Sequence, residues 1–329
     1  MTRYSKSLLQ LTAVAAAAAL TSSAFAAAAV DANAEFDTTY YSKARAPYTT
    51  ANDTMNQGGR IEVNISSKTT VGSGFVAGRG TLLLGKNAGS AGIDDAWVQG
   101  GTSSFSVKLG RFEAADMAPA GKDVLVIGGG GYNGQTLRGR KGDATPHFAF
   151  NADFGGGVGF ELGVLEENTG SNVVDTPAVV GPPAIPATYK KGVKLGLRPI
   201  VSFAAGPVSA KVGFEKSGLP NAKIGLAATV GFGLAGGNIN VNLASQGKNS
   251  AAGETSASNS FGVNGTFGPF GAAAITGKDH FGNKGNMVFV AYSMPFFIDA
   301  ATFTIAASTG KTPGAQKEAG VRGRVNYSF

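Results

Sequence analysis

The stretch EAGVRGRVNYSF (318–329) ends the chain, and its residues alternate between two kinds with a period of two. One face carries Val321, Gly323, Val325, Tyr327 and Phe329, and the other carries Arg322, Arg324, Asn326 and Ser328. This alternation is typical of a β-strand with one apolar and one polar face. A disordered tail would normally end in small or charged residues, so the aromatic ending predicts a segment built into a sheet.

The same alternation recurs along almost the whole chain. Examples are VDANAEF (30–36), GRIEVNISSK (59–68), FSVKLGR (105–111), HFAFNADF (147–154) and VKLGLR (193–198). Counting such segments gives about sixteen, each close to the ~10-residue alternating unit of a membrane-spanning strand. The later segments lie near 221–233, 236–247, 257–267, 269–278, 285–294, 299–308 and 317–329. The chain is therefore predicted to be all-β.

The first residues predict a secretory signal peptide. Arg3 and Lys6 precede an apolar run from Leu8 to Leu20, and small residues at Ala24 and Ala26 suit a cleavage site. We expect residues 1–26 to be removed and residues 27–329 to form the mature barrel. A transmembrane anchor is the alternative, but the apolar run is shorter than the ~20 residues that a helical span needs.

Composition narrows the class further. The chain has no cysteine, so disulfides cannot stabilise it, and 50 of its 329 residues are glycine without a collagen repeat. Removing Arg3 and Lys6 would lower the formal charge from +7 to +5. This excess is scattered, which argues against a nucleic-acid partner.

The connections between the alternating segments point to a closed barrel. Short Gly/Pro turns alternate with longer loops near 42–57, 86–93, 113–143, 166–188, 248–256, 279–284 and 309–316. This sorting favours a transmembrane, antiparallel up-and-down β-barrel, whereas a soluble Greek-key sandwich would not be expected to show it. A barrel of about sixteen strands is too wide to fill with side chains, so its polar face should line water and its apolar face should meet lipid.

Closure also explains the aromatic ending of the chain. Every backbone N–H and C=O group must be paired in lipid, so the last strand should pair with the first. We expect Tyr327 and Phe329 to lie in the aromatic girdle at the membrane interface.

The alternation assigns charged residues to the inside of the wall. The expected inward cations are Arg60, Lys68, Arg79, Lys108, Lys194, Arg198, Lys211, Lys223, Arg322 and Arg324, and the expected inward acids are Asp31, Glu35, Asp37, Glu62, Glu161 and Glu215. Loop 113–143 adds Glu113, Asp116, Lys122, Asp123, Arg138, Arg140 and Lys141. Rings of charge set the ion preference of a pore, and this excess of cations predicts a mild preference for anions. For any single residue, a merely solvated position in the lumen is an equally good interpretation.

Two stretches resemble known porins in their residues as well as in their pattern. DAWVQGGTSSFSVKLGRF (95–112) is similar to the strand–turn–strand that precedes the long third loop of general porins of Gram-negative bacteria, of the neisserial and other β-proteobacterial type. GRVNYSF (323–329) resembles the aromatic-ending strand that the outer-membrane assembly machinery recognises in that family. The resemblance implies a homotrimer in the outer membrane, surrounded by lipids and lipopolysaccharide. It also implies that loop 113–143 folds into the lumen and forms the pore constriction.

This resemblance has two departures. The first strand lacks the Tyr-Gly pair often seen in the family, and the loop carries IGGGGYNG (127–134) in place of a Pro-Glu-Phe-Gly-type segment. The path of the loop is therefore open from the sequence alone.

The leading hypothesis is a passive, water-filled channel for ions and small hydrophilic solutes, without a cofactor or covalent chemistry. The second is a substrate-selective porin with a saturable site in the loop, for which Tyr132 and Arg138 are candidates. The third is an outer-membrane barrel enzyme or adhesin. His147 and His280 are the only histidines, and no Gly-x-Ser-x-Gly elbow or P-loop is present, so neither a hydrolase, a nucleotide site nor a metal site is favoured.

Overall fold

A computed structural model of the chain shows an all-β protein. The residues it describes are 28–43, 54–85, 91–118, 137, 147–168, 173–176, 188–190, 193–218, 222–249 and 252–329. The predicted signal peptide (1–26) and most of loop 113–143 lie outside these residues.

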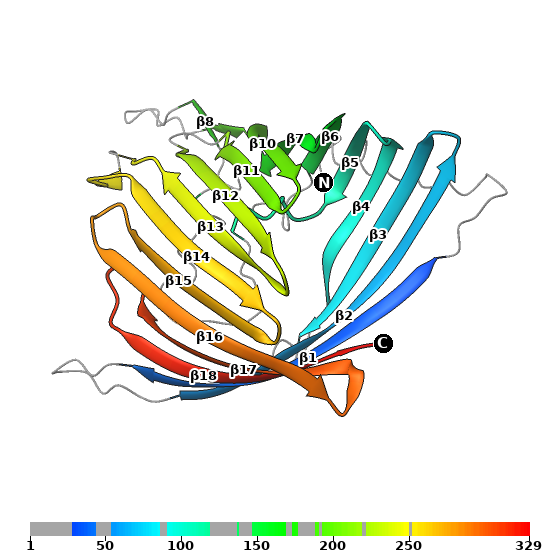
Figure 1. Cartoon of the computed structure of the whole chain (residues 1–329). Helices are drawn as coiled ribbons and strands as arrows, with labels where there is room; N and C mark the ends of the chain where they lie inside the picture. Colours follow the sequence, from blue (N-terminus) through cyan, green and yellow to red (C-terminus); the bar gives the residue numbers. More distant parts are fainter. Residues whose placement is uncertain are drawn as a thin grey trace.

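The strands form one closed antiparallel barrel (Figure 1). Its first half comprises β1 (Ala29–Lys43), β2 (Thr54–Val71), β3 (Gly74–Gly85), β4 (Ala91–Thr102), β5 (Phe105–Arg111), β6 (His147–Gly155), β7 (Val158–Asn168) and β10 (Val193–Ala205). Its second half comprises β11 (Val208–Lys216), β12 (Ile224–Leu234), β13 (Gly237–Gln246), β14 (Ser258–Phe267), β15 (Phe270–Lys278), β16 (Lys284–Phe296), β17 (Ile298–Lys311) and β18 (Glu318–Ser328). The prediction of an all-β barrel of sixteen strands is confirmed. A two-stranded sheet of β8 (Val173–Thr176) and β9 (Thr188–Lys190) belongs to the connection between β7 and β10 and is separate from the barrel sheet.

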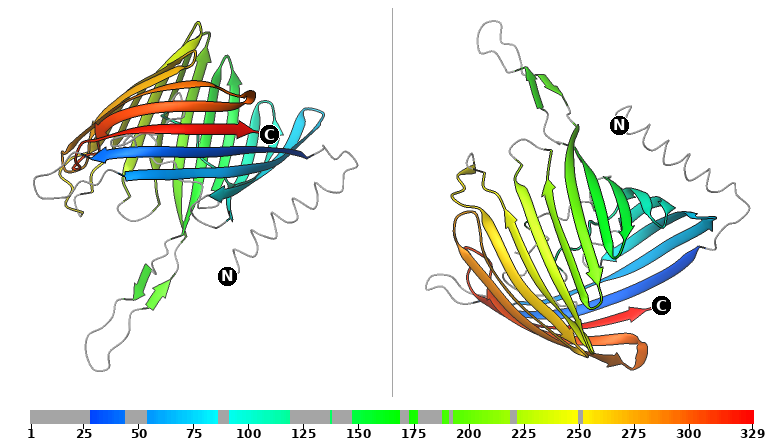
Figure 2. Two further views of the ribbon diagram at one scale, coloured as in Figure 1. Left: turned by 90° about the horizontal axis from the view of Figure 1, so that it is seen from below. Right: turned by 45° about the horizontal axis from the view of Figure 1, so that its top comes forward.

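The last strand closes the barrel on the first, as the aromatic ending predicted. β18 runs antiparallel to β1 from Asn33 opposite Ser328 to Lys43 opposite Glu318, and the two strands lie side by side in Figure 2. The pairing continues to the last residue, because Ala32 N donates to Phe329 O at 2.8 Å and Phe329 N donates to Ala32 O at 2.9 Å. No edge strand is left between the two ends, which satisfies the backbone groups that would otherwise face lipid.

Connections of two kinds lie at the two ends of the barrel. The short turns include those at 72–73, 156–157, 206–207 and 268–269, and the longer connections include 217–223, which the sequence pattern had not separated as a loop. Gly157 shows why glycine is required in such turns, because its φ is 81° and a Cβ there would collide with the Ala204 carbonyl oxygen. Phe297, the single residue between β16 and β17, has a φ of 64° although it is not glycine.

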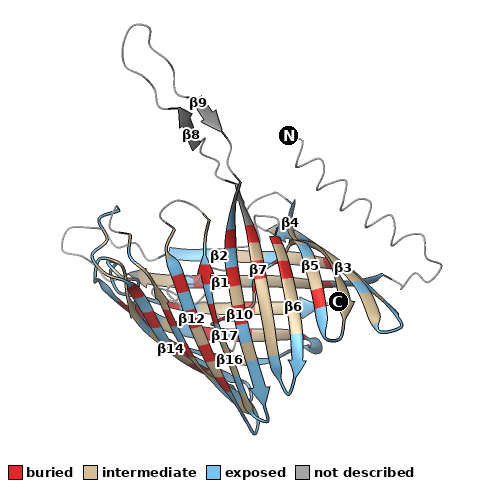
Figure 3. Cartoon of the chain, turned by 90° about the horizontal axis from the view of Figure 1, so that it is seen from above, coloured by how far each residue is buried: buried red, intermediate tan, exposed pale blue. Residues whose placement is uncertain are grey.

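The two faces of the wall differ as the alternation predicted. On β12, Leu226 and Phe232 are exposed on the outside, whereas Ala227 and Thr229 are buried on the inside. The resulting stripes of buried and exposed residues run along the strands in Figure 3. Large apolar side chains with free surface on the outside of a closed barrel are expected of a protein whose solvent is the lipid bilayer.

The inner face is not polar everywhere, and in this respect the expectation was incomplete. Met287, Phe289 and Ala291 of β16 point inward and are buried together with Ala273 of β15 and Ala306 of β17. The outward neighbours Val288 and Val290 are apolar as well. A strand that is apolar on both faces gives no period-two contrast, so the sequence pattern could not reveal this inner patch.

Candidate functional site: the barrel lumen

The charged side chains of the lumen gather on one part of the wall, from β18 through β1–β7 to β10 and β11, and most of them form ion pairs. Arg79 lies 3.4 Å from Glu62 and 3.7 Å from Asp95. Arg324 lies 3.2 Å from Glu35 on the adjacent strand. Further pairs join Arg60 to Glu35 and Glu62, Arg322 and Arg324 to Asp37, and Arg198 to Glu215. Pairing across adjacent strands cancels much of the field that these groups would otherwise project into the lumen.

A smaller set of inward charges has no ion pair recorded within the described residues. These are Lys68, Lys108 and Lys211 among the cations and Asp31, Asp153 and Glu161 among the acids. The inward acids Asp95 and Asp153 were omitted from the set expected from the sequence. With them, the two signs are close to balance on the described wall, so the excess of inward cations expected from the sequence is not found there. Lys194 lies on β10 opposite Glu167, but its side chain is outside the described part.

Lys108, in the middle of β5, lies between two aromatic rings, of which Phe112 begins the long connection after that strand. Its Nζ lies 3.9 Å from the centre of the Trp97 ring and 4.4 Å from the centre of the Phe112 ring. The Phe112 ring in turn contacts the His147 ring, with 3.5 Å between their centroids. Cation–π contacts of this kind hold an ammonium group in place without neutralising its charge, so Lys108 presents a fixed positive charge to the lumen.

The rest of the wall is uncharged. Among the described residues of β12–β17, none of the side chains that face inward carries a charge. Amides and hydroxyls take their place: the Thr229 hydroxyl oxygen lies 2.7 Å from Asn242 Oδ1, and the Asn240 side-chain amide donates to Asn264 Oδ1 at 3.0 Å. The lumen thus has a charged side and a neutral side, a division that no single strand reveals.

The start of the long loop lies against this neutral side. The Thr229 hydroxyl donates to the Met117 carbonyl at 2.6 Å, and the Gln246 amide donates to the Leu137 carbonyl at 2.9 Å. Met117 is fully buried and Leu137 is 3% exposed, and they pack with Ile200, Ala227 and Ala244 of the inner wall. Met117 and Leu137, in the described parts of the loop, therefore contact the inner face of β12 and β13.

The charged residues predicted for the loop are only partly visible. Glu113 is exposed, and Asp116 accepts a hydrogen bond from the Ala118 amide at 2.8 Å. Lys122, Asp123, Tyr132, Arg138 and Arg140 lie outside the described residues. Their expected role in a constriction stays a prediction.

Sequence reasoning missed a polar cluster that ties three loops together at the long-loop rim. The Lys223 ammonium lies 2.8 Å from both Glu254 Oε1 and His280 Nε2, and His280 Nδ1 lies 3.4 Å from Glu254 Oε2. His280 Nε2 is also 3.1 Å from Gln246 Oε1, and Gln246 is the residue that holds Leu137. The members are spread over nearly sixty residues, so only the barrel brings them together.

The same cluster contains a serine within hydrogen-bond distance of the histidine ring. Ser258 Oγ lies 3.1 Å from His280 Nε2, and Glu254 lies near the other ring nitrogen of His280. The contacts of these three side chains therefore resemble those of a serine hydrolase triad. However, Ser258 is fully buried, and the Lys223 ammonium approaches the same ring nitrogen more closely. A nucleophile must be open to its substrate, and this arrangement therefore favours a structural clasp over a hydrolase.

The clasp is predicted to loosen in acid. Burial raises the pKa of Glu254, but the hydrogen bonds from Lys223 and the Asn249 amide, with the charges of His280 and Lys223, outweigh it and hold the pKa below the ordinary 4.5. A lowered pKa stabilises the folded loops fully above about pH 4.5, and this contribution is lost as the pH falls through the folded-state pKa. The pKa of Asp279 is also lowered, because hydrogen bonds from Asn283 and Phe281 outweigh the effect of burial.

Glu254→Gln should reproduce this acid state at neutral pH. Loss of charge-assisted hydrogen bonds worth about 1.5 kcal/mol should raise tryptic cleavage after Lys248 about tenfold at pH 7.5. Asp299→Asn, at the opposite rim, is the matched control and should leave this cleavage unchanged. Equal cleavage in Glu254→Gln and the unaltered chain would show that the clasp does not hold these loops.

The described residues contain neither a membrane-spanning helix nor a metal-binding cluster. No helix among them is long and apolar enough to cross a membrane. Nor do they contain a group of three or more His, Asp or Glu side chains placed to hold a metal ion.

A closed barrel that is apolar outside, with charges and amides lining a lumen, defines the porin class of outer-membrane channels. The family described as porin-like glycoporin RafY matches residues 23–231, more than half of the sequence. The chain belongs to this family. It therefore forms an outer-membrane porin channel.

Solved structures agree on the fold. Two of them are variants of the Rhodopseudomonas blastica porin, a double mutant and a triple mutant. Each has a TM-score of 0.62 and is 12% identical to this chain. Each match covers 92% of this chain and 100% of the porin. No curated protein matches the sequence.

Proposed function

We propose that this porin is a passive, water-filled channel through which ions and small hydrophilic solutes diffuse down their gradients, without a cofactor or covalent chemistry. The observation that carries the proposal is the inverted wall, with exposed apolar side chains such as Val290 outside and polar groups such as Asn242 and Arg324 inside. Its partners would be outer-membrane lipids, lipopolysaccharide, the assembly machinery that receives GRVNYSF, and two further copies of the chain in a homotrimer.

We further propose that the ion preference is mild and favours anions. The support is the net positive charge of the chain, together with the ammonium groups of Lys68 and Lys108, which lie over aromatic rings. The near balance of inward acids and bases argues against a strong preference. The remaining loop residues would contribute Lys122, Arg138 and Arg140 against Asp123.

Planar-bilayer recording tests both statements. Purified protein should produce stepwise conductance, and a salt gradient should give a reversal potential of the sign expected for chloride preferred over potassium. Lys108→Met should move that potential toward zero, because it removes a fixed charge from the lumen. Lys284→Met, which removes a cation from the outer face of β16, should not change it.

A membrane that stays sealed with folded barrel present would contradict the channel, whereas a potential of opposite sign would contradict only the anion preference.

A second candidate is a carbohydrate-selective porin with a saturable site at the constriction. The description of its family as a glycoporin favours it, as does the uncharged wall of β12–β17, whose amides and hydroxyls suit sugar hydroxyl groups. Saturating block by a trisaccharide at low concentration in the same recording would support this candidate. A conductance that sugars do not change would contradict the carbohydrate-selective porin and would be consistent with the general diffusion channel.

A further inference from the structure

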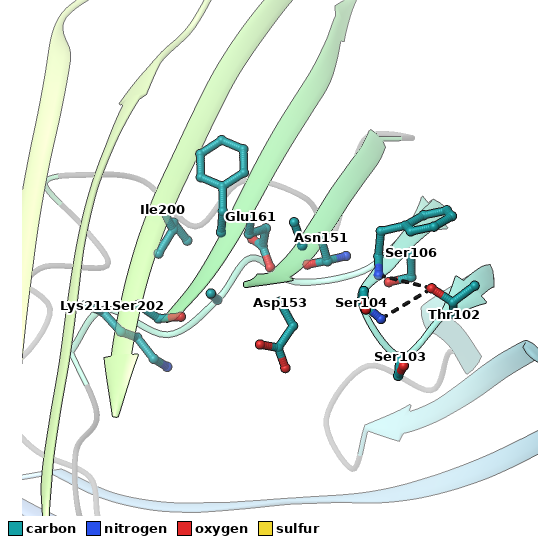
Figure 4. Close-up of a pocket in the computed structure, with 15 residues that line it drawn as sticks. Thr102, Ser103, Ser104, Ser106, Asn151, Asp153, Glu161, Ile200, Ser202 and Lys211 are labelled. Carbon is teal, nitrogen blue, oxygen red and sulfur yellow. Dashed lines mark hydrogen bonds between the residues drawn. The ribbon is translucent and has the colours of Figure 1, made fainter. Parts of the chain in front are cut away.

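A cavity of about 320 Å³ opens from the lumen between the wall and the start of the long loop. It lies toward the short-turn end, where residues 102–106 meet the ends of β6, β7, β10 and β11 (Figure 4). Ala115 of the long loop also lines it. Its volume is at the lower end of the range found for ligand sites, enough for a solute about as large as a dipeptide.

Charged groups of both signs enter this cavity from the wall. Figure 4 shows Glu161, Asp153 and Lys211 extending toward a common space, with Asn151 and Ser202 beside them. The register explains their proximity, because Asn151 lies opposite Glu161 and Ser202 lies opposite Lys211 on adjacent strands. Opposed positions on one face of an antiparallel sheet place side chains within reach of one ligand.

Unlike the arginines of the lumen wall, the charged groups of this cavity form no ion pair within the described residues. Arg79, Arg198 and Arg324 all have carboxylate partners, whereas no ion pair is recorded for Glu161, Asp153 or Lys211 within the described residues. Among the described residues, the one hydrogen bond that Asp153 accepts comes from the Gly155 amide of its own turn, at 2.8 Å. A pair of carboxylates and an ammonium that face one cavity without neutralising each other can each bind an opposite charge on a solute.

The lining does not suit a sugar ring. The aromatic residues of the cavity lining, Phe105 and Phe160, both lie opposite Ala152, on the outward face of the wall. A sugar ring in this cavity would therefore have no aromatic ring to stack on. Aromatic side chains are common in the lining of ligand pockets. Separated opposite charges favour instead a solute that carries both signs.

We propose that this cavity is a binding subsite for small zwitterions that carry a free ammonium and a free carboxylate, the chemical class of amino acids and dipeptides. The ammonium would lie between Glu161 and Asp153, and the carboxylate would meet Lys211, with Asn151 and Ser202 completing the hydrogen bonds. The subsite rests on the proposed channel, since solutes reach it through the lumen. Weak, reversible binding is what a conducting pore can use, because a tightly held solute would not leave.

Dipeptide-dependent block of single-channel current tests the subsite. In 0.1 M KCl, where screening is moderate, Ala-Ala should reduce the current with a saturating concentration dependence. N-acetyl-Ala-Ala, Ala-Ala amide and sucrose should each need at least about tenfold more, because each lacks one or both charge-assisted contacts. Glu161→Gln and Lys211→Met should each weaken the Ala-Ala block about tenfold.

The matched controls are Asp31→Asn and Lys68→Met, which remove inward charges of the same sign on β1 and β2, away from the cavity. Ala-Ala should block the current through both control variants at the same concentration as it blocks the unaltered channel. Equal block by sucrose or by the capped dipeptides, or unchanged block in both cavity variants, would overturn the subsite while the channel stood.

A barrel that carries no current would instead contradict the proposed function. Equilibrium dialysis of radiolabelled Ala-Ala against the detergent-folded protein would then decide the subsite alone, with binding lost in Glu161→Gln as the supporting result and no binding to the unaltered protein as the contrary one.

Discussion

Replacing Val290 with arginine should destabilise the barrel in a phospholipid bilayer by about 2–4 kcal/mol, the cost of a cation on the lipid face at mid-membrane depth. Val290 lies near the middle of β16, points outward and is 56% exposed. In water, such a substitution on an exposed strand would change stability little. A penalty of this size is therefore specific to an outer face that meets hydrocarbon.

The matched control is Asn240→Arg on β13, which places the same side chain on the inner face. It removes the 3.0 Å hydrogen bond from Asn240 to Asn264, worth about 1 kcal/mol, but leaves the new charge in water. Urea unfolding of barrels folded into vesicles measures both variants, with the fluorescence of Trp97, the only tryptophan, as the signal. Equal penalties on the two faces would contradict the assignment of lipid to the outside.

Met117→Ala should release the start of the long loop from the inner wall without unfolding the barrel. Met117 is fully buried against Ile200, Ala227 and Ala244, and truncating a buried methionine costs about 2–5 kcal/mol. The hydrogen bond from the Thr229 hydroxyl to the Met117 carbonyl, which the substitution leaves in place, contributes about 1 kcal/mol. We expect frequent current fluctuations in single-channel recordings, together with a larger mean conductance.

Met294→Ala provides the comparison, since Met294 lies on the outer face of β16 and contacts no part of the loop among the described residues. Its channels should conduct like those of the unaltered protein. Quiet, unchanged current from Met117→Ala would show that the contacts of Met117 do not position the loop.

Much of the fold could be predicted because the alternation of neighbouring residues in a barrel strand shows which side chains face the lumen and which face the lipid. Arg322 and Arg324 are separated by a glycine and followed by Asn326, and this spacing alone places all three on the face opposite Val325 and Tyr327. The same rule placed Arg60, Lys108 and Arg198 on the inner wall, where the structure has them. It failed where contrast was missing, as at Met287 and Phe289, and it gave no path for residues 113–143 because a loop has no such period.

The sequence alone determined that apolar and polar residues alternate along the chain, that enough alternating segments exist to close a barrel, and which side chains of each strand share a face. These are properties of neighbouring residues, fixed by the two-residue repeat of an extended backbone. Only the tertiary structure decided which of these charges form ion pairs and which do not. Glu161 and Lys211 are fifty positions apart and Lys223 and His280 still farther, and strand register, which depends on the whole closed sheet, sets what each one meets.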